Sequence, residues 1–233
     1  MCIRDSVHVA NALAAFISLE FRSADSAFDR WLSGDDGALN EAQHRGRQLF
    51  YGKATCHSCH SGPLLSSHVF KALSLPAFGP GRTRQFDPIA RDVGRMGESD
   101  RIEDAYRFRV PMLRNVELTS PYGHNGAYRT LDAMIKHHVD PVQSANNWST
   151  EMPVLAEAEW LAAIDFVIQQ DKLEIQRQRA QIDVQLPELN QQEIDDLVAF
   201  LRALTGAQAA AESSVIPDVV PSGLPVVSIS SKR

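Results

Sequence analysis

Two of the three cysteines in this 233-residue chain lie three positions apart, in the stretch KATCHSCHSGPLL at residues 53–65. Cys59 is followed directly by His60, so the stretch contains the pattern Cys56-x-x-Cys59-His60. Two thiols at this spacing can each add to a vinyl group at one edge of a porphyrin, and the next histidine can supply an imidazole to the iron. The pattern therefore predicts one covalently attached c-type haem, with Cys56 and Cys59 as thioether residues and His60 as the proximal ligand.

Other uses of these cysteines fit the sequence less well. A redox-active Cys-x-x-Cys normally lies near a βαβ pattern, which this sequence does not show. A zinc site needs four ligands in a tetrahedron, and His57 and His60 could join the two cysteines only by placing four ligands within five residues. Three cysteines are too few for a disulfide framework. A zinc-stabilised helical domain stays as an alternative that metal analysis can separate from a haem protein.

Apolar residues at helical spacing predict a mostly α fold that brings these side chains together. The clearest helix covers residues 190–205, where Asn190 and Glu193 form a capping pair at its start and Gly206 follows its end. We expect this helix to cross the helix at residues 41–52 that leads into the cysteine motif, so that the two close one side of a haem pocket. Further helices are expected at residues 7–21, from Thr130 through TLDAMIKHHV, and at residues 156–180, with a long ordered loop at residues 74–105.

The composition excludes several other classes of protein. With a formal net charge of −6, the chain lacks the basic balance of a nucleic-acid-binding protein. Its 44% hydrophobic residues favour a packed core over disorder. No apolar run approaches the roughly 20 residues that a membrane-spanning helix needs.

The first six residues, MCIRDS, contain neither the apolar segment nor the cleavage site of a secretory signal. A c-type haem is normally attached outside the cytoplasmic membrane, so a periplasmic location is expected. The two observations agree if the sequence is the C-terminal part of a longer protein. We therefore interpret residues 1–6 as a non-native start and place no weight on Cys2.

A six-coordinate haem iron needs a second axial ligand. The segment AMIKHH at residues 133–138 offers two on one helix face, because Met134 and His138 are four residues apart. His137 points about 100° away from that face. The residue pattern does not choose between Met134 and His138. The full set of histidines and methionines considered is His44, His68, His124, His137, His138, Met96, Met112, Met134 and Met152.

Several segments together resemble the bacterial di-haem cytochrome c peroxidases and their MauG-like relatives. The segment FRVPMLRNVELTSPYGHNGAYRTLDAMIKHH, close to a Cys-x-x-Cys-His motif, is far more specific than that motif alone. The resemblance spans most of residues 7–225. Its matching stretches are SAFDRWLSGD at 26–35, RGRQLFYGKATCHSCHSGPLL at 45–65, the segment just quoted at 108–138, ELNQQEIDDLVAFLRAL at 188–204 and VPSGLP at 220–225.

The resemblance implies two cytochrome-c-like domains with one haem each. The N-terminal haem meets hydrogen peroxide, and the C-terminal haem passes electrons to it. This chain has one Cys-x-x-Cys-His and its motifs resemble the C-terminal half, so residues 7–206 are expected to form one cytochrome-c-like haem domain and residues 207–233 an extended or mobile tail. The implied partners are the missing N-terminal haem domain and a small electron-donor redox protein, and a homodimer is compatible with the resemblance. A stand-alone mono-haem electron carrier is the alternative function.

The resemblance also implies particular ligands. The distal ligand of this haem is a methionine in the peroxidases and a tyrosine in MauG-like enzymes, and the ending Lys136-His137-His138 places His138 at that position. A bis-histidine iron should be a weaker oxidant than a histidine–methionine iron. Met134 is the ligand if the helix register slips by one turn. The family also holds a calcium ion between its domains, which would take the carbonyl oxygens of Thr119 and Pro121 here, because carbonyl oxygens suit a hard cation.

Overall fold

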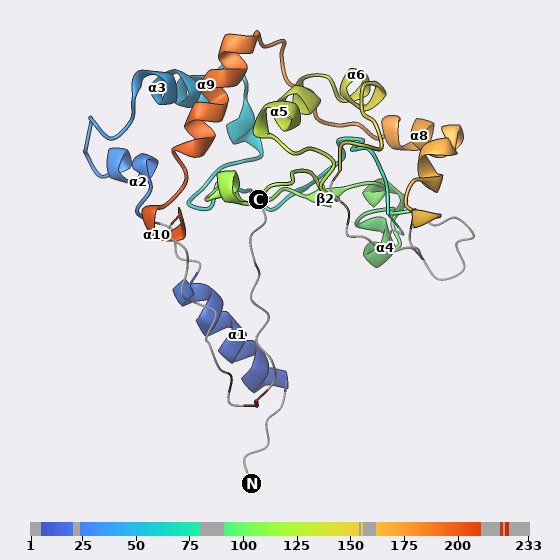
Figure 1. Cartoon of the computed structure of the whole chain (residues 1–233), viewed down its shortest axis with the longest axis horizontal. Helices are drawn as coiled ribbons and strands as arrows, with labels where there is room; N and C mark the ends of the chain where they lie inside the picture. The colour runs from blue at the N-terminus through green and yellow to red at the C-terminus, as the bar shows by residue number, and fades with distance from the viewer. Residues whose placement is uncertain are drawn as a thin grey trace.

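Short helices joined by irregular segments make up most of the chain that the structure describes (Figure 1). The computed structural model describes residues 6–20, 24–79, 91–153, 155, 162–210, 220 and 222–223. Strands β1 (Phe70–Lys71) and β2 (Phe108–Arg109) form one antiparallel pair. The predicted mostly α fold class is confirmed. In chain order the helices and single helical turns are α1 (Ser6–Glu20), α2 (Ala27–Leu32), α3 (Glu41–Tyr51), η1 (Cys56–Ser58), α4 (Met96–Ser99), η2 (Ile102–Asp104), η3 (Val116–Leu118), α5 (Leu131–Val139), α6 (Pro141–Asn146), η4 (Val167–Gln170), α8 (Lys172–Arg179), α9 (Gln191–Arg202) and α10 (Ala207–Ala210).

Helices α3 and α9 cross in close contact, as the sequence predicted. A Cβ atom added to Gly46 of α3 would lie 1.9 Å from the carbonyl oxygen of Asp196 in α9. The two backbones can approach this closely because residue 46 has no side chain. Arg45 donates two hydrogen bonds of 2.8 Å to the two carboxylate oxygens of Asp196, which fixes the crossing from its polar side.

Capping side chains set where these helices begin. At the start of α3, Asn40 accepts a bond from the Gln43 backbone N–H and the Gln43 side chain accepts one from the Asn40 N–H, both at 2.9 Å. Asn190 and Glu193 make the same reciprocal pair at 2.9 Å before α9. Each pair satisfies two backbone donors that a helix start otherwise leaves unpaired. The Thr130 hydroxyl caps α5. The helix starts predicted at Asn190 and Thr130 are therefore confirmed, and the Asn40–Gln43 pair is an additional cap that the structure shows.

The prediction of one continuous helix at residues 156–180 is wrong, although Lys172–Arg179 within that range is helical. Residues 156–161 lie outside the described residues, and the chain then forms η4 and the separate helix α8. The Asp171 carboxylate accepts a bond of 3.0 Å from the Glu174 backbone N–H. An aspartate in this position caps a new helix, because it supplies an acceptor to the first turn.

Two other expectations are met in part. Within the loop predicted at residues 74–105, the structure has the short elements α4 and η2, while residues 80–90 lie outside the described part. Helix α9 ends at Arg202, before Gly206, and α10 occupies the start of the predicted tail. Most of the remaining tail, like Phe21 and residues 1–5, lies outside the described residues.

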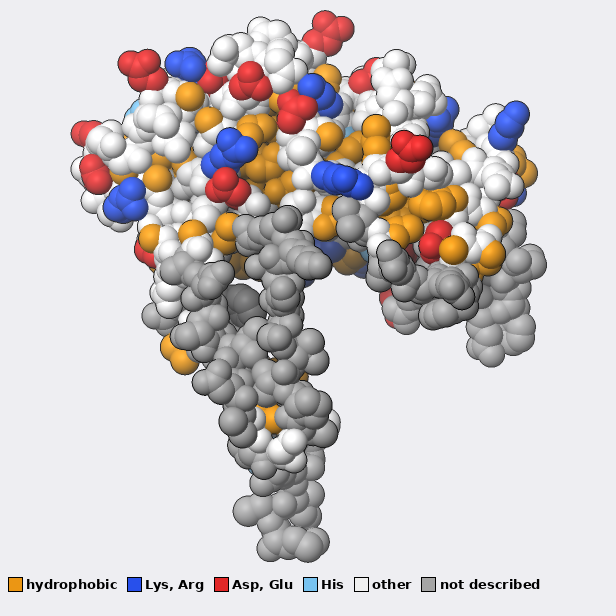
Figure 2. Space-filling view, viewed as in Figure 1, with side chains coloured by type: hydrophobic (Ala, Val, Ile, Leu, Met, Phe, Trp, Pro, Cys, Tyr) orange, Lys and Arg blue, Asp and Glu red, His pale blue; other side chains and the backbone are white. Residues whose placement is uncertain are grey.

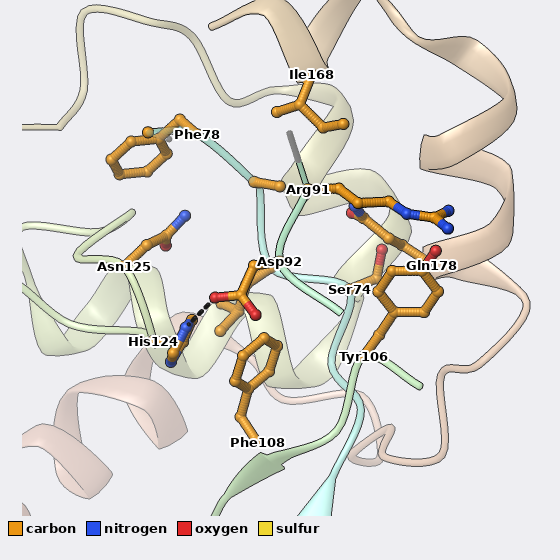
Figure 3. A pocket seen from close by; sticks show the side chains of 13 residues that line it. Ser74, Phe78, Arg91, Asp92, Tyr106, Phe108, His124, Asn125, Ile168 and Gln178 are labelled. Atoms are coloured by element: carbon orange, nitrogen blue, oxygen red, sulfur yellow. Dashed lines mark hydrogen bonds and ion pairs between the residues drawn. The ribbon is translucent and has the colours of Figure 1, made fainter. Parts of the chain in front are cut away.

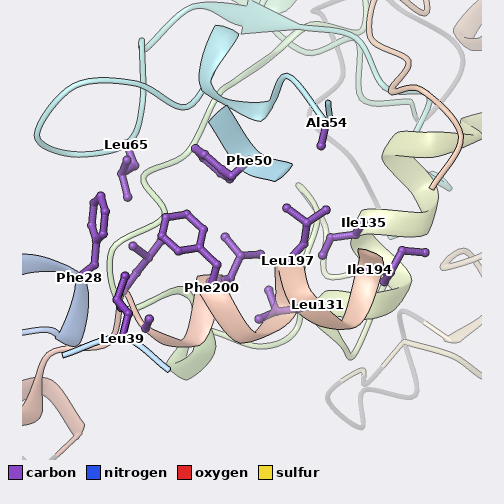
Figure 4. Close-up of a cluster of buried hydrophobic side chains, with 13 residues drawn as sticks. Phe28, Leu39, Phe50, Ala54, Leu65, Leu131, Ile135, Ile194, Leu197 and Phe200 are labelled. Carbon is purple, nitrogen blue, oxygen red and sulfur yellow. The ribbon is translucent and has the colours of Figure 1, made fainter. Parts of the chain in front are cut away.

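The main hydrophobic core lies between α2, α3, α5 and α9, next to the cysteine motif (Figure 4). At its centre the Phe200 ring of α9 packs edge-on against Phe28 and at 60° to Phe50, with ring centroids 5.2 Å apart in both pairs. The ring of Phe50, in the last turn of α3, is 1% exposed. The core therefore joins the helix that leads into the motif to the helix that crosses it.

Charged side chains of both signs are interspersed over the face shown in Figure 2, with apolar side chains between them. Neither sign dominates that face. Of the helices in the described ranges, none is both long and apolar enough to cross a membrane.

Candidate haem site

The cysteine motif forms a helical turn directly after α3. The backbone turns at Gly52, Thr55 takes a left-handed φ of 53°, and η1 begins at Cys56. The Cys56 carbonyl accepts bonds from the N–H groups of Cys59 at 3.2 Å and of His60 at 2.9 Å. This turn gathers the two thiols and the imidazole on one short segment, which is the arrangement that attachment to one porphyrin needs.

The two thiols do not form a disulfide with each other. Burial raises the pKa of the Cys56 thiol to about 12. A thiol used for redox exchange needs a lowered pKa, because the thiolate is the attacking species. The environment of Cys56 therefore disfavours the redox alternative.

Arg114 fixes the chain that follows the motif. Its guanidinium donates two bonds of 2.8 Å to the Asp29 carboxylate of α2 and a third, of 2.6 Å, to the Pro63 carbonyl. Asp29 in turn belongs to the capping pair that starts α2 at Ser26. Three segments distant in sequence are thus tied together beside His60.

The His60 ring is held by backbone carbonyl groups. Its Nδ1 lies 3.2 Å from the Leu65 carbonyl oxygen. Burial, and next the proximity of His138, lower the pKa of His60 to about 4 despite bonds to the carbonyls of Leu65 and Pro111. The ring is therefore neutral near pH 7, and with Nδ1–H donated to Leu65 its lone pair is on Nε2. A neutral imidazole with one nitrogen bonded to a carbonyl is the form that binds a metal.

The His138 ring has the same features. It lies in the last turn of α5, and its Nδ1 is 2.8 Å from the Met134 carbonyl oxygen. Burial lowers the pKa of His138, which keeps its ring neutral too. The proximity of His138 is one of the causes that lower the pKa of His60, so the structure brings the two rings near each other. With Nδ1 beside a carbonyl oxygen, each ring can present Nε2.

The remaining histidines and methionines of the predicted set are engaged elsewhere or exposed. Met134 is half-buried and packs against the cluster of Phe78, Ala127 and Tyr128. His137 bonds to protein atoms through both of its ring nitrogens. His44 contacts the Trp31 ring, His68 contacts the Ser66 hydroxyl and Arg109, and His124 contacts the Asp92 carboxylate and the Phe108 ring. Met96 lies in the buried cluster of Val93, Ala105 and Tyr106. Met112 and Met152 are exposed.

The side chains at this site fit a covalently attached haem. Two unpaired thiols and two neutral imidazoles are the donor set that a c-type haem with two histidine ligands requires. A zinc site fits less well, because the described residues contain no group of three or more histidine, cysteine or acidic side chains able to hold a metal ion. His60 and His138 would hold the iron, and Cys56 and Cys59 the porphyrin.

The predicted calcium ligands lie on the surface. Thr119 and Pro121 are both exposed, and the Thr119 hydroxyl donates a bond of 3.0 Å to the Val116 carbonyl. Calcium takes six to eight oxygen ligands, so two carbonyl oxygens alone would not form a site. The calcium ion stays a prediction that needs further oxygens.

Sequence reasoning missed two groups of polar residues. One lines a pocket beside β2, where His124 and Asp92 pair at 2.8 Å near Tyr106 and Asn125 (Figure 3). The other surrounds His137. No local pattern marks either group, because the members come from segments that only folding brings together.

Comparison with known proteins relates these features to characterised relatives. No protein-family model matches the chain. The chain is 32% identical to the cytochrome c peroxidase Ccp of Escherichia coli over 200 residues, which are 85% of this chain and 32% of Ccp. It is 28% identical over 212 residues to the methylamine utilization protein MauG of Methylophilus methylotrophus, covering 90% of this chain and 50% of MauG. The chain therefore spans from about a third to half of the length of these relatives.

Solved structures show the same fold. A MauG-like protein associated with microbial copper homeostasis superposes with a TM-score of 0.54 at 26% identity, covering 82% of this chain and 55% of that protein. The diheme peroxidase BthA of Burkholderia thailandensis superposes with a TM-score of 0.57 over 95% of this chain and 55% of BthA, at 18% identity, and shows the fold alone. Over most of its length, the chain is therefore homologous to the di-haem cytochrome c peroxidase and MauG family, whose members bind c-type haem.

Proposed function

We propose that this chain is the electron-transferring c-type haem domain of a di-haem cytochrome c peroxidase or MauG-like oxidoreductase. The observation that carries the proposal is the pairing of His60 and His138. One imidazole follows the two cysteines, the other lies at the end of α5, and each has Nδ1 beside a backbone carbonyl oxygen. Both rings are kept neutral by burial.

The residues divide the work between attachment and ligation. Cys56 and Cys59 would form the thioether bonds to the haem, and His60 and His138 would ligate its iron. The bound haem supplies the one-electron change between ferric and ferrous iron. With both histidines bound to the iron, peroxide would find no open position on this haem. Reaction with peroxide would then belong to the other haem domain of the whole protein.

The surface of α1 supports a partner domain of this kind. Helix α1 lies apart from the other helices in Figure 1, and Val9, Leu13 and Ile17 are between 53% and 56% exposed. Burying an apolar surface of this kind stabilises an interface. We infer that this face packs against the N-terminal haem domain in the whole protein.

The other assignments follow from the family and are part of the same proposal. The protein is placed in the periplasm, where c-type haem is attached, and it receives electrons from a small redox protein. Calcium would bind between the two domains, with Thr119 and Pro121 supplying carbonyl oxygens and the other domain supplying the rest. A homodimer is compatible with these assignments.

Haem attachment tests the proposal. The chain, exported in a host with haem-c maturation machinery, should gain one haem that stays bound after denaturation and gives a pyridine haemochrome spectrum. A Cys56→Ala/Cys59→Ala variant is the matched control and should lose its haem on denaturation. Release of all haem from the denatured parent, or zinc in place of iron by metal analysis, would contradict the proposal.

A further inference from the structure

The His137 imidazole lies next to the proposed iron ligand but bonds to the protein through both ring nitrogens. It is fully buried, with 0% of its surface exposed. Its Nε2 lies 2.8 Å from the Leu73 carbonyl oxygen, and its Nδ1 lies 2.9 Å from the Tyr128 hydroxyl. The Tyr128 hydroxyl is in turn 2.8 Å from the Ser144 hydroxyl of α6.

These three contacts have a defined direction. The Leu73 carbonyl can only accept, so Nε2–H of His137 donates to it. Nδ1 of the neutral ring then accepts from the Tyr128 hydroxyl, and the Tyr128 oxygen accepts from the Ser144 hydroxyl. The result is a row of hydrogen bonds, Ser144–Tyr128–His137–Leu73, in which each donor faces an acceptor.

This row of hydrogen bonds holds the turn of α5 that carries His138. Leu131 and Ile135 of the same helix pack into the main core. The backbone of His138 itself is tied by its carbonyl oxygen, which accepts a bond of 2.9 Å from the Leu186 N–H. Because His137 and His138 are neighbours on a helix, a rotation that breaks the His137 contacts also moves the His138 ring.

A ligand side chain must be held within about 0.5 Å of its working position, so the groups that lock a ligand affect the strength of its metal bond. We propose that the Ser144–Tyr128–His137–Leu73 row of hydrogen bonds positions His138 on the iron. His137 and Tyr128 are thus positioning residues. This inference rests on the proposed function, in which His138 is the distal ligand.

Binding of carbon monoxide to the ferrous haem-loaded protein tests the inference, because carbon monoxide can bind only where His138 leaves the iron. Tyr128→Phe keeps the ring and removes both hydroxyl bonds. We expect carbon monoxide to bind this variant about 10–100-fold more tightly than the parent, the usual effect of losing a group that orients a ligand. We expect a gain of high-spin absorption in the same variant.

Two further variants distinguish positioning from simple structural support. His137→Gln can keep the donor to Leu73 but loses the bond to Tyr128, so its carbon monoxide affinity should lie between parent and Tyr128→Phe. Lys136→Gln changes an exposed side chain of the same helix and should match the parent. Ser144→Ala, which breaks only the outermost bond, should shift the affinity in the same direction as Tyr128→Phe and keeps the test available if a core variant folds poorly.

The outcomes separate the inference from the proposed function. His138→Ala should give the tightest carbon monoxide binding of the series. If His138→Ala opens the iron but Tyr128→Phe and Ser144→Ala both stay within twofold of the parent, the positioning role is wrong and the ligand assignment stands. If His138→Ala does not open the iron, His138 is not the ligand, and both the assignment and the inference fail.

Discussion

At the scale of single residues, the site depends on which ring nitrogen each histidine presents. His60 and His138 each have Nδ1 beside a carbonyl oxygen, so Nε2 can act as the ligand atom. His137 has protein partners at both nitrogens and cannot ligate iron without breaking one of those bonds. The partners of the ring nitrogens therefore distinguish His138 from its neighbour His137 in the same helix.

Replacing His138 by methionine should raise the reduction potential of the haem. Thioether sulfur favours ferrous iron more than imidazole does, so the ferrous state gains stability. A spectroelectrochemical titration of His138→Met and the parent measures the change. An unchanged or lower potential in the variant would mean that residue 138 is not bound to the iron.

Met134→Ala should leave the haem spectrum nearly unchanged. The Met134 side chain packs with Phe78, Ala127 and Tyr128, so its loss should cost packing, about 2 kcal/mol of unfolding free energy for a partly buried methionine. Urea unfolding and the absorption spectrum measure the two effects. Should Met134→Ala instead open the iron while His138→Ala does not, the ligand is the methionine one turn earlier.

At the scale of elements, the crossing of α3 and α9 positions the cysteine motif. The Cβ of Gly46→Ala would meet the Asp196 carbonyl oxygen at 1.9 Å, and backbone atoms cannot move aside as a flexible side chain can. We expect a loss of roughly 3 kcal/mol or more in unfolding free energy, at the upper end of overpacking effects. Gly37→Ala is the control, because residue 37 is exposed and should change stability by about 0.5 kcal/mol or less. Equal urea midpoints for the two variants would show that the close crossing is unimportant.

The Arg45–Asp196 ion pair should make stability depend on pH on the acid side. The bonds from Arg45 outweigh desolvation and lower the pKa of Asp196 below its ordinary value. A carboxyl with a lowered folded-state pKa stabilises the fold above its unfolded pKa of about 3.9, and this contribution is lost as the pH falls through the lower folded value.

Unfolding free energies of the parent and Asp196→Asn, measured between about pH 2 and pH 7, check this expectation. The parent should lose its advantage over the variant as the pH falls below about 4. Parallel curves for the two proteins would indicate that Asp196 has the same pKa in the folded and unfolded states.

The sequence predicted those parts of the fold that depend on neighbouring residues. The capping pair Asn190–Glu193 and the cap at Thr130 act within one turn, so the starts of α9 and α5 could be read from the sequence. The sequence did not predict the break before α8. Nothing in the sequence distinguishes Asp171 from the other polar residues of the segment, and only the structure shows that its carboxylate caps the first turn of α8. The partners of His137 could not be predicted, because Leu73 is distant along the chain and meets it only in the folded protein.

At the scale of the whole molecule, we propose that two haem domains share one reaction. The chain spans from about a third to half of the length of its relatives, and we do not expect it to complete the reaction cycle alone. With both axial positions occupied, the haem-loaded chain should exchange electrons but turn over peroxide poorly. Stopped-flow assays with reduced cytochrome c as donor measure this. His138→Ala, which opens the iron, should react with peroxide faster than the parent, and brisk turnover by the parent would contradict the division of roles.

The electron paramagnetic resonance spectrum of the ferric haem-loaded chain tests the central claim most directly. If His60 and His138 both ligate the iron, the parent should show a low-spin ferric signal with no appreciable high-spin component. The His138→Ala variant, prepared in the same way, should become largely high-spin because it loses one strong-field ligand. A high-spin parent spectrum, or a low-spin signal that persists unchanged in His138→Ala, would contradict the assignment of His138 and with it the proposed electron-transfer site.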